Sequence, residues 1–216
     1  MGAAERRTLA INSMSSSFRP LIVGIGGTTR AGSSSEKALR YALSLAEAQG
    51  ADTQLFVGAS VNLPMYAPES PVRTEDARTM LAALRRAHGV ILATPCYHGS
   101  VSGLIKNALD YTEDMAHDPY PYLDGRAVGL IVCGHGWQST GVTLSAFRSI
   151  VHALRGWPTP MGVALNTLVE KFDESGALAH EHAAQQMAIM VSQVVDFARM
   201  RGLQMNADSG AVAPVS

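Results

Sequence analysis

Short apolar runs alternate with amphipathic helical patterns along most of this 216-residue chain. Runs such as LIVGIG at Leu21–Gly26 and GVILAT at Gly89–Thr94 are apolar at successive positions, which is typical of strands covered on both faces. A helical pattern separates each run from the next, as crossover connections between parallel strands require. Such crossovers are right-handed in nearly all cases. The alternation therefore predicts a parallel α/β sheet with helices on both faces.

The periodicity places five strands and five helices in one domain at about residues 20–202. The strands are expected at Leu21–Gly26, Thr53–Ala59, Gly89–Thr94, Ala127–Cys133 and Met161–Asn166. The helices are expected at Glu36–Gln49, Glu75–Ala87, Ser102 to Met115, Thr143–Arg155 and Leu178–Met200. A doubly wound sheet of strand order 2-1-3-4-5 fits this pattern. Residues 1–19 are expected to form a flexible arm and residues 203–216 a flexible tail.

The charge balance excludes several classes of function. Lys plus Arg is 17 and Asp plus Glu is 18, so no basic excess favours nucleic acid, and the near-zero charge argues against an acidic electron carrier. Charged residues make up only 16%, below the roughly 25% of soluble domains, so we expect another subunit to cover part of the surface. Two cysteines, no signal peptide and no run of ~18 apolar residues predict a cytoplasmic protein without a disulfide framework or a membrane span.

In a doubly wound sheet, ligands bind at the carboxyl ends of the strands, so the chemistry is expected in loops 27–35, 95–101 and 134–141. The first loop lies within GGTTRAGSSS at Gly26–Ser35. It lacks the lysine of the P-loop, and Thr29 stands where a dinucleotide motif needs its last glycine. A hydroxyl-rich strand-to-helix junction nevertheless favours an anion such as phosphate, although a solvated loop with a serine cap is the alternative. The candidate donors are Thr28, Arg30, Ser33, Ser34 and Ser35.

The second loop suits a flat ring. It begins at Pro95, which ends a buried strand, and brings Tyr97 to the carboxyl edge of the sheet. Gly99 allows the backbone to approach a ligand closely. Main-chain N–H groups of this loop could then point at the carbonyl groups of a planar ligand.

Two stretches resemble the NAD(P)H-dependent FMN reductase family of flavodoxin-like folds, and the likeness in strand order covers about residues 20–200. The family loop G-S-x-R-x-x-S-x-N is met by Arg30 and Ser33, with Thr28 and Ser35 as polar replacements. The family pattern P-x-Y-N-G-S-x-x-G-x-L-K-N-A-L-D is met by Pro95, Tyr97, Gly99, Ser100, Gly103, Lys106, Asn107, Ala108, Leu109 and Asp110. His98 departs from the usual Asn, and Cys96 stands where the family often has Glu.

The resemblance implies an FMN site and assigns each loop a role. The phosphate would be held by Thr28, Arg30, Ser33 and Ser35. The isoalloxazine edge would be wrapped by Pro95, Cys96, Tyr97, His98, Gly99 and Ser100. The other side would be closed by Gly134, His135, Gly136 and Trp137. No catalytic side chain is needed, because the nicotinamide passes its hydride to flavin N5.

The resemblance implies an NAD(P)H-dependent FMN reductase that forms a homodimer or homotetramer, with reduced FMN supplied to a flavin-dependent monooxygenase. The alternatives are a reductase of quinones, azo dyes or metal ions that keeps its FMN, a flavodoxin-like electron carrier, and a non-catalytic relative that binds another phosphorylated ligand. NADH and NADPH both stay open at this point, because the chain carries no nicotinamide-binding fingerprint.

Several single residues admit two interpretations. Cys96 and Cys133 lie near the ends of neighbouring strands and could form a redox pair, although two separate thiols are the simpler reading. His98 could tune the flavin or a bound quinone, or could be a tolerated polar residue. Trp137 could stack on the ligand or fill a subunit contact. The remaining candidates, His180 and His182 at spacing i, i+2, face different directions on a helix, so we expect no metal site there.

Overall fold

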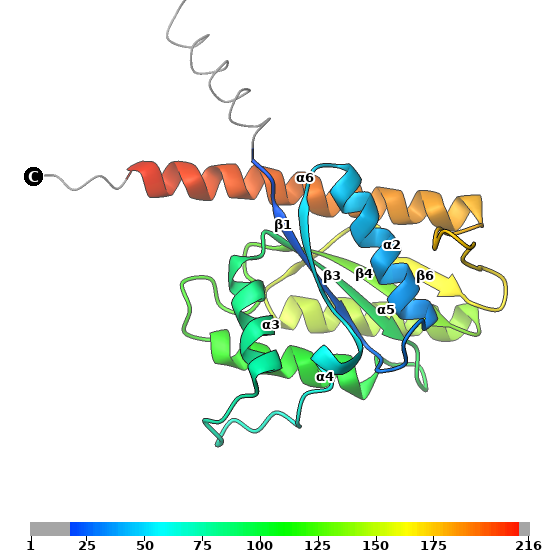
Figure 1. Ribbon diagram of the computed structural model, residues 1–216, viewed down its shortest axis with the longest axis horizontal. Coiled ribbons are helices and arrows are strands. Elements are labelled where there is room, and N and C mark those ends of the chain that lie inside the picture. The colour runs from blue at the N-terminus through cyan, green and yellow to red at the C-terminus, as the bar shows by residue number, and fades with distance from the viewer. Residues whose placement is uncertain (1–17, 212–216) are drawn as a thin grey trace, which may run out of the picture.

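The computed structural model describes residues 18–211 and places six parallel strands in one sheet. The strands are β1 Leu21–Gly26, β2 Asp52–Phe56, β3 Gly89–Pro95, β4 Ala127–Gly134, β5 Trp157–Pro158 and β6 Val163–Asn166. Their order is β2-β1-β3-β4-β5, with β6 also paired to β4. This confirms the predicted flavodoxin-like sheet, and Figure 1 shows its central strands running side by side.

The predicted fifth strand corresponds to β6, and a short strand that was not predicted, β5, precedes it. Trp157 and Pro158 pair with the start of β4, whereas Val163–Asn166 pairs with its end. Pro158 and Pro160 lack the N–H group that a strand donates to its neighbour, which explains the interruption between the two segments. The predicted start at Met161 was therefore two residues early.

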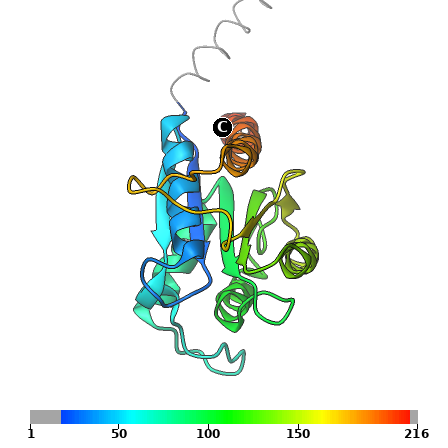
Figure 2. The same ribbon diagram turned by 90° about the vertical axis from the view of Figure 1, so that its right-hand side faces the viewer.

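Helices cover both faces of the sheet. They are α2 Ser34–Ala48, α3 Glu75–Arg86, α4 Gly103–Asp110, α5 Trp137–Ala153 and α6 Glu181–Ala211, with 3-10 turns at Gly58–Val61 and Tyr111–Met115. One buried cluster joins the sheet to α3, α4 and α5, and a second joins it to α2 and α6. Figure 2 shows the strands between these two groups of helices.

Several helix boundaries differ from the prediction. Helix α2 begins at Ser34 rather than Glu36, because the Ser33 hydroxyl caps it. Helix α5 begins at Trp137 rather than Thr143, since Gly136 adopts an extended conformation and serves as its N-cap. Helix α6 begins at Glu181 and continues to Ala211, so residues 203–211 are helical where a flexible tail was predicted. The predicted arm falls almost wholly on residues 1–17, which, like residues 212–216, lie outside the described residues.

Ser102 fixes the two loops that follow β1 and β3. Its hydroxyl donates to the carbonyl oxygen of Gly27 at 2.7 Å and accepts from the N–H of Ile105, which caps α4. The N–H of Ser102 donates to the hydroxyl of Thr94 at 3.0 Å. A side chain on Gly27 would approach the Ser102 hydroxyl within 2.8 Å, so these loops are closely packed. The carboxyl ends of β1 and β3 are thereby held in one arrangement.

Within residues 18–211, no helix combines the length and the apolar character needed to cross a membrane.

Candidate functional site

A cavity of about 650 Å³ lies at the carboxyl ends of β1, β3 and β4. Its walls come from the three loops in which the sequence predicted the chemistry. Every residue that the resemblance assigned to the site, apart from Ser100 and Trp137, lines it. The volume falls within the range of cavities that hold cofactors and small ligands.

One end of the cavity is built to receive an anion. Ser33, Ser34 and Ser35 form the cap and first turn of α2, and all three line the cavity. The Ser33 hydroxyl accepts from the N–H of Glu36 and lies 3.4 Å from the Ser35 hydroxyl. A helix leaves its first N–H groups without intrahelical partners, so the N–H groups of Ser34 and Ser35 are free to donate to a ligand. Arg30 supplies an exposed positive charge beside them.

Glu36 stabilises this anion-binding end. Its carboxylate accepts from the N–H of Gly32 at 3.0 Å and pairs with Arg40 at 2.8 Å. Gly32 adopts a φ of 66°, which glycine reaches without strain, and the loop turns there toward α2. Because Arg40 neutralises the buried carboxylate, Glu36 can shape the loop without repelling an anion bound at the helix terminus.

The residues after β3 form a tight turn at the cavity wall. The N–H and carbonyl groups of Tyr97 and Ser100 bond to each other in both directions at 3.0 Å. His98 and Gly99 between them have φ values of 52° and 79°. Two successive positive φ angles define a type I′ turn, which favours Asn-Gly. Ser100 closes this turn through its backbone and does not line the cavity.

The departure of His98 from the family pattern has a structural explanation. Few residues other than glycine adopt positive φ readily, and asparagine, aspartate and histidine are the commonest of them. A histidine at this position therefore keeps the backbone of the turn while replacing an amide with an imidazole. The exposed side chain of His98 lines the cavity.

The third wall comes from β4 and the segments that follow β4 and β6. Gly134, His135 and Gly136 line it as predicted, but the sequence analysis did not assign Cys133, Ser139 or Thr167 to the site. Ser139 lies in the predicted third loop, in the first turn of α5. Thr167 follows β6 and donates from its N–H to the carbonyl of Gly134 at 2.8 Å. Its position directly after a parallel strand is the signal that could have identified it.

The two cysteines lie on opposite faces of the sheet. Cys133 packs against the cluster that contains α2 and α6, whereas Cys96 packs against the cluster on the opposite face. Both thiols are free. Complete burial and the nearby Glu170 raise the pKa of Cys133 to about 12, so this thiol stays neutral. The Cys96 sulfur is engaged with α5, accepting from the Thr143 hydroxyl at 2.9 Å.

The other individual predictions have mixed outcomes. Lys106 and Asp110, which lie four residues apart on α4, form an ion pair at 2.5 Å. The His182 ring lies 3.1 Å from the side-chain nitrogen of Gln186. Trp137 is 55% exposed and does not line the cavity.

Comparison with known proteins gives a consistent picture. Residues 20–169 match the family model described as NADPH-dependent FMN reductase. An FMN-dependent NADPH-azoreductase of Staphylococcus saprophyticus subsp. saprophyticus is 32% identical over 126 residues, which is 57% of this chain and 63% of that protein. A protein of the same description from Staphylococcus haemolyticus is 36% identical over 110 residues, 50% of this chain and 55% of that one. The chain thus spans roughly three fifths of these relatives.

A likeness to solved structures supports the fold alone. FerB, a flavoenzyme NAD(P)H:(acceptor) oxidoreductase from Paracoccus denitrificans, superposes with a TM-score of 0.68 at 19% sequence identity. The match covers 84% of this chain and 98% of that chain. The shared architecture therefore extends beyond the residues that the family model matches.

Proposed function

We propose that this chain, which belongs to the NADPH-dependent FMN reductase family, is an enzyme that binds FMN in the cavity and reduces it with NADPH. One observation supports this above the others. A helix terminus rich in hydroxyl and N–H donors and a flat turn of backbone meet in a single cavity of about 650 Å³. A phosphorylated ligand with a planar ring system needs both features together.

The donor set at the start of α2 fits the phosphate of FMN. Arg30 would contribute a fixed charge, and Ser33 and Ser35 would contribute hydroxyl groups beside the free N–H groups. Hydrogen bonds to a charged group contribute about 1.5–3 kcal/mol each. Thr28 lies at the same end, where its hydroxyl accepts from the N–H of Arg30 at 3.1 Å and so helps to hold the loop.

The chain's own part in the reaction is binding and orientation. FMN, when bound, supplies the atom that accepts the hydride, so the protein needs no acid or base for that step. The turn Tyr97–Ser100 and the wall Gly134–Gly136 would hold the ring between them. Cys133 is a neutral buried thiol and Cys96 is hydrogen-bonded to α5, so neither is assigned a redox role.

A second candidate function differs in the molecule that finally accepts the electrons. The sequence analysis favoured release of reduced FMN to a monooxygenase. Exposed apolar side chains around the cavity, among them Tyr97 and Trp137, favour instead an enzyme that keeps FMN and reduces an organic acceptor. The description of the staphylococcal relatives as azoreductases supports the same choice. A cytoplasmic homodimer or homotetramer remains our proposal for its setting.

The test begins with the purified full-length chain. FMN titration, followed by quenching of flavin fluorescence, should show saturable binding, and anaerobic NADPH should bleach the bound flavin within seconds. Parallel titration with NADH measures the nucleotide preference. FMN that stays with the protein through gel filtration supports the reductase that keeps its flavin, whereas loss of FMN supports release to a partner.

Two results would contradict the proposal. Binding without bleaching would identify an electron carrier, and absence of FMN binding would identify a site for another phosphorylated ligand.

A further inference from the structure

Two acidic side chains are buried among the residues that the structure describes, and only one of them has a cationic partner. Glu36, at the start of α2, pairs with Arg40 at 2.8 Å. Glu170, which follows β6, is 4% exposed, and none of the ion pairs formed by the described residues includes it. Its carboxylate accepts a hydrogen bond from the N–H of Asn166 at 2.7 Å. The fold therefore buries an uncompensated negative charge, which is costly.

The local structure around Glu170 does not require a charge. A glutamine at this position would offer a carbonyl oxygen to the same N–H group of Asn166, at a lower cost of burial. The turn is also closed without the carboxylate, because the N–H groups of Val169 and Glu170 donate to the Asn166 carbonyl at 3.0 and 2.8 Å. Functional sites are where proteins tend to retain ionisable groups that the fold alone does not need.

Glu170 lies directly behind one wall of the cavity. Asn166, whose N–H group it accepts, is the β6 partner of Gly134 in the sheet register. Thr167 donates to the carbonyl of Gly134 from its N–H and from its hydroxyl, at 2.8 and 3.2 Å. Gly134 and Thr167 line the cavity together with Cys133. Burial first, and the charge of Glu170 second, raise the pKa of the Cys133 thiol, so the field of the carboxylate reaches this wall.

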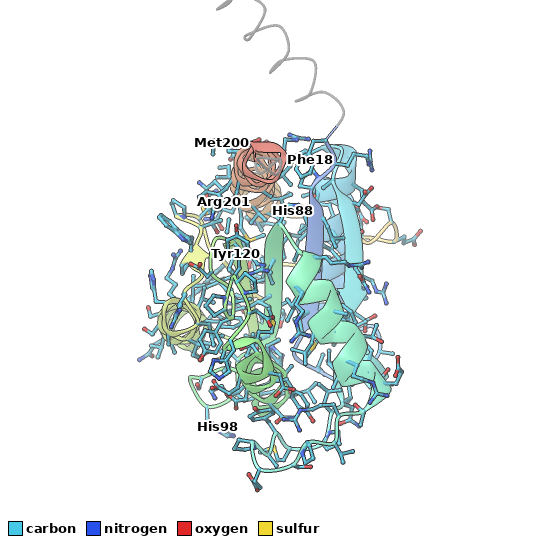
Figure 3. The ribbon with its side chains drawn as sticks, turned by 90° about the vertical axis from the view of Figure 1, so that its left-hand side faces the viewer. Phe18, His88, His98, Tyr120, Met200 and Arg201 are labelled. Atoms are coloured by element: carbon cyan, nitrogen blue, oxygen red, sulfur yellow. The ribbon has the colours of Figure 1, made fainter. Side chains whose placement is uncertain are left out.

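The buried cation of the described residues lies far from this carboxylate. Arg126 is 5% exposed and donates to backbone carbonyls at the end of α3. It lines a small pocket together with His88 and Arg201. Figure 3 shows His88 and Arg201 at the end of the molecule opposite to His98, which lines the cavity. Arg126 therefore does not neutralise the charge behind the cavity wall.

The cations on the cavity side are exposed to solvent. Arg30 and His135 line the cavity, and Lys171, next to Glu170 in the sequence, donates from its ammonium group to the carbonyl of Thr167. Water and salt screen exposed charges much more than buried ones. The Glu170 carboxylate is thus the least screened charge beside this wall.

We propose that the Glu170 carboxylate lowers the reduction potential of FMN bound in the cavity, a role that rests on the proposed function, in which the flat ring lies against the Gly134–Gly136 wall. A hydride from NADPH carries two electrons and one proton, so the ring that receives it gains one negative charge. A buried carboxylate behind the wall repels this added charge. The protein then binds reduced FMN less tightly relative to oxidised FMN, and the bound flavin is a stronger reductant.

Two variants separate the charge of Glu170 from its hydrogen bond. Glu170→Gln keeps an oxygen that accepts from Asn166 and removes the charge. Glu170→Asp keeps the charge, but its shorter side chain draws the acceptor away from Asn166. Glu174→Gln removes an exposed acid from the following turn and is the matched control. The FMN-loaded proteins are titrated anaerobically with dithionite in the presence of a reference dye, which gives the midpoint potential without NADPH.

Glu170→Gln should bind reduced FMN about tenfold more tightly relative to oxidised FMN, the change expected for two unit charges about 10 Å apart at an effective dielectric constant of about 20. For a two-electron couple, this tenfold change raises the midpoint potential by about 30 mV. Glu170→Asp and Glu174→Gln should keep the affinity ratio within about twofold of the unaltered protein, because neither loses a buried charge.

Binding of oxidised FMN supplies a further readout. The phosphate-binding loop follows β1, three strands from β6 in the sheet, which is roughly 14 Å at the usual strand spacing. The dissociation constant of oxidised FMN should therefore change by less than about threefold in Glu170→Gln. The urea midpoint of this variant should stay the same or rise, because an unpaired charge leaves the interior.

Two results would overturn the role of Glu170. One is an unchanged potential in Glu170→Gln. The other is an equal shift in Glu170→Asp, because the effect would then come from the geometry of the turn at Asn166 rather than from the charge. The proposed function fails separately: an unaltered protein that binds no FMN, or whose bound FMN responds to dithionite but not to NADPH, would refute it.

Discussion

Removal of the Ser102 hydroxyl should lower both the free energy of unfolding and the affinity of the cavity for FMN. Ser102 is 2% exposed, and its hydroxyl donates to the Gly27 carbonyl at 2.7 Å while accepting from the N–H of Ile105 at 3.2 Å. Loss of a helix cap costs about 1 kcal/mol. A buried acceptor left without its donor costs about 1–3 kcal/mol more. Ser102→Ala should therefore lower the free energy of unfolding by about 2–4 kcal/mol.

Urea denaturation followed by circular dichroism measures this loss. With a slope of about 2 kcal/mol per molar urea, the midpoint should fall by about 1–2 M. Ser145→Ala is the matched control, because the Ser145 hydroxyl makes only an exposed bond to the Gly141 carbonyl on α5. FMN affinity should also fall in Ser102→Ala, since Gly27 precedes the phosphate loop. A loss of less than about 0.5 kcal/mol, the usual range for surface substitutions, would refute the assigned roles of this hydroxyl.

Three further outcomes are expected. Arg30→Ala should raise the FMN dissociation constant by about 10- to 100-fold, from loss of about 1.5–3 kcal/mol, and an unchanged fluorescence titration would remove Arg30 from the phosphate site. Burial, together with the nearby charge of Arg126, lowers the pKa of His88, so the fold favours the neutral imidazole. This preference contributes its full stability above the ordinary pKa of histidine, about 6.5, and the contribution declines as pH falls below that value. The urea midpoint of the unaltered protein should therefore drop between pH 7.5 and pH 5. His88→Asn should show a smaller drop over the same range. Arg73→Lys should lower the free energy of unfolding by about 1–2 kcal/mol, because lysine cannot reproduce the two hydrogen bonds that Arg73 donates to Asp114. Thermal or urea denaturation measures this loss, and an unchanged free energy of unfolding would contradict the importance of that geometry.

The sheet could be predicted because each central strand is a short apolar run. In β3 the first six residues are buried, and in β4 the first seven are, which leaves a continuous apolar sequence as the signal. The start of α5 could not be predicted in the same way. Gly136 and Gly141 resemble loop residues in sequence, and only the tertiary position of Trp137 shows that the helix has already begun there.

The site was largely predictable because parallel strands bring their carboxyl ends to one edge. The loops after β1, β3 and β4 met there, as expected from the strand order alone. Thr167 was missed because its position depends on the pairing of β6 with the end of β4 across more than thirty residues of sequence. The opposite directions of Cys96 and Cys133 follow from the register of β3 and β4, which a pattern of apolar residues does not specify.

The shape of the turn that carries His98 does not depend on the His98 side chain. Its reverse bend depends on two mutually bonded peptide groups and on Gly99, whereas the imidazole contributes none of the bonds that close it. Asparagine, aspartate or glycine could therefore occupy the same corner with little rearrangement of the main chain. A single codon at this corner can thus exchange an imidazole, a carboxylate or an amide at the cavity wall while the bend of the main chain stays the same.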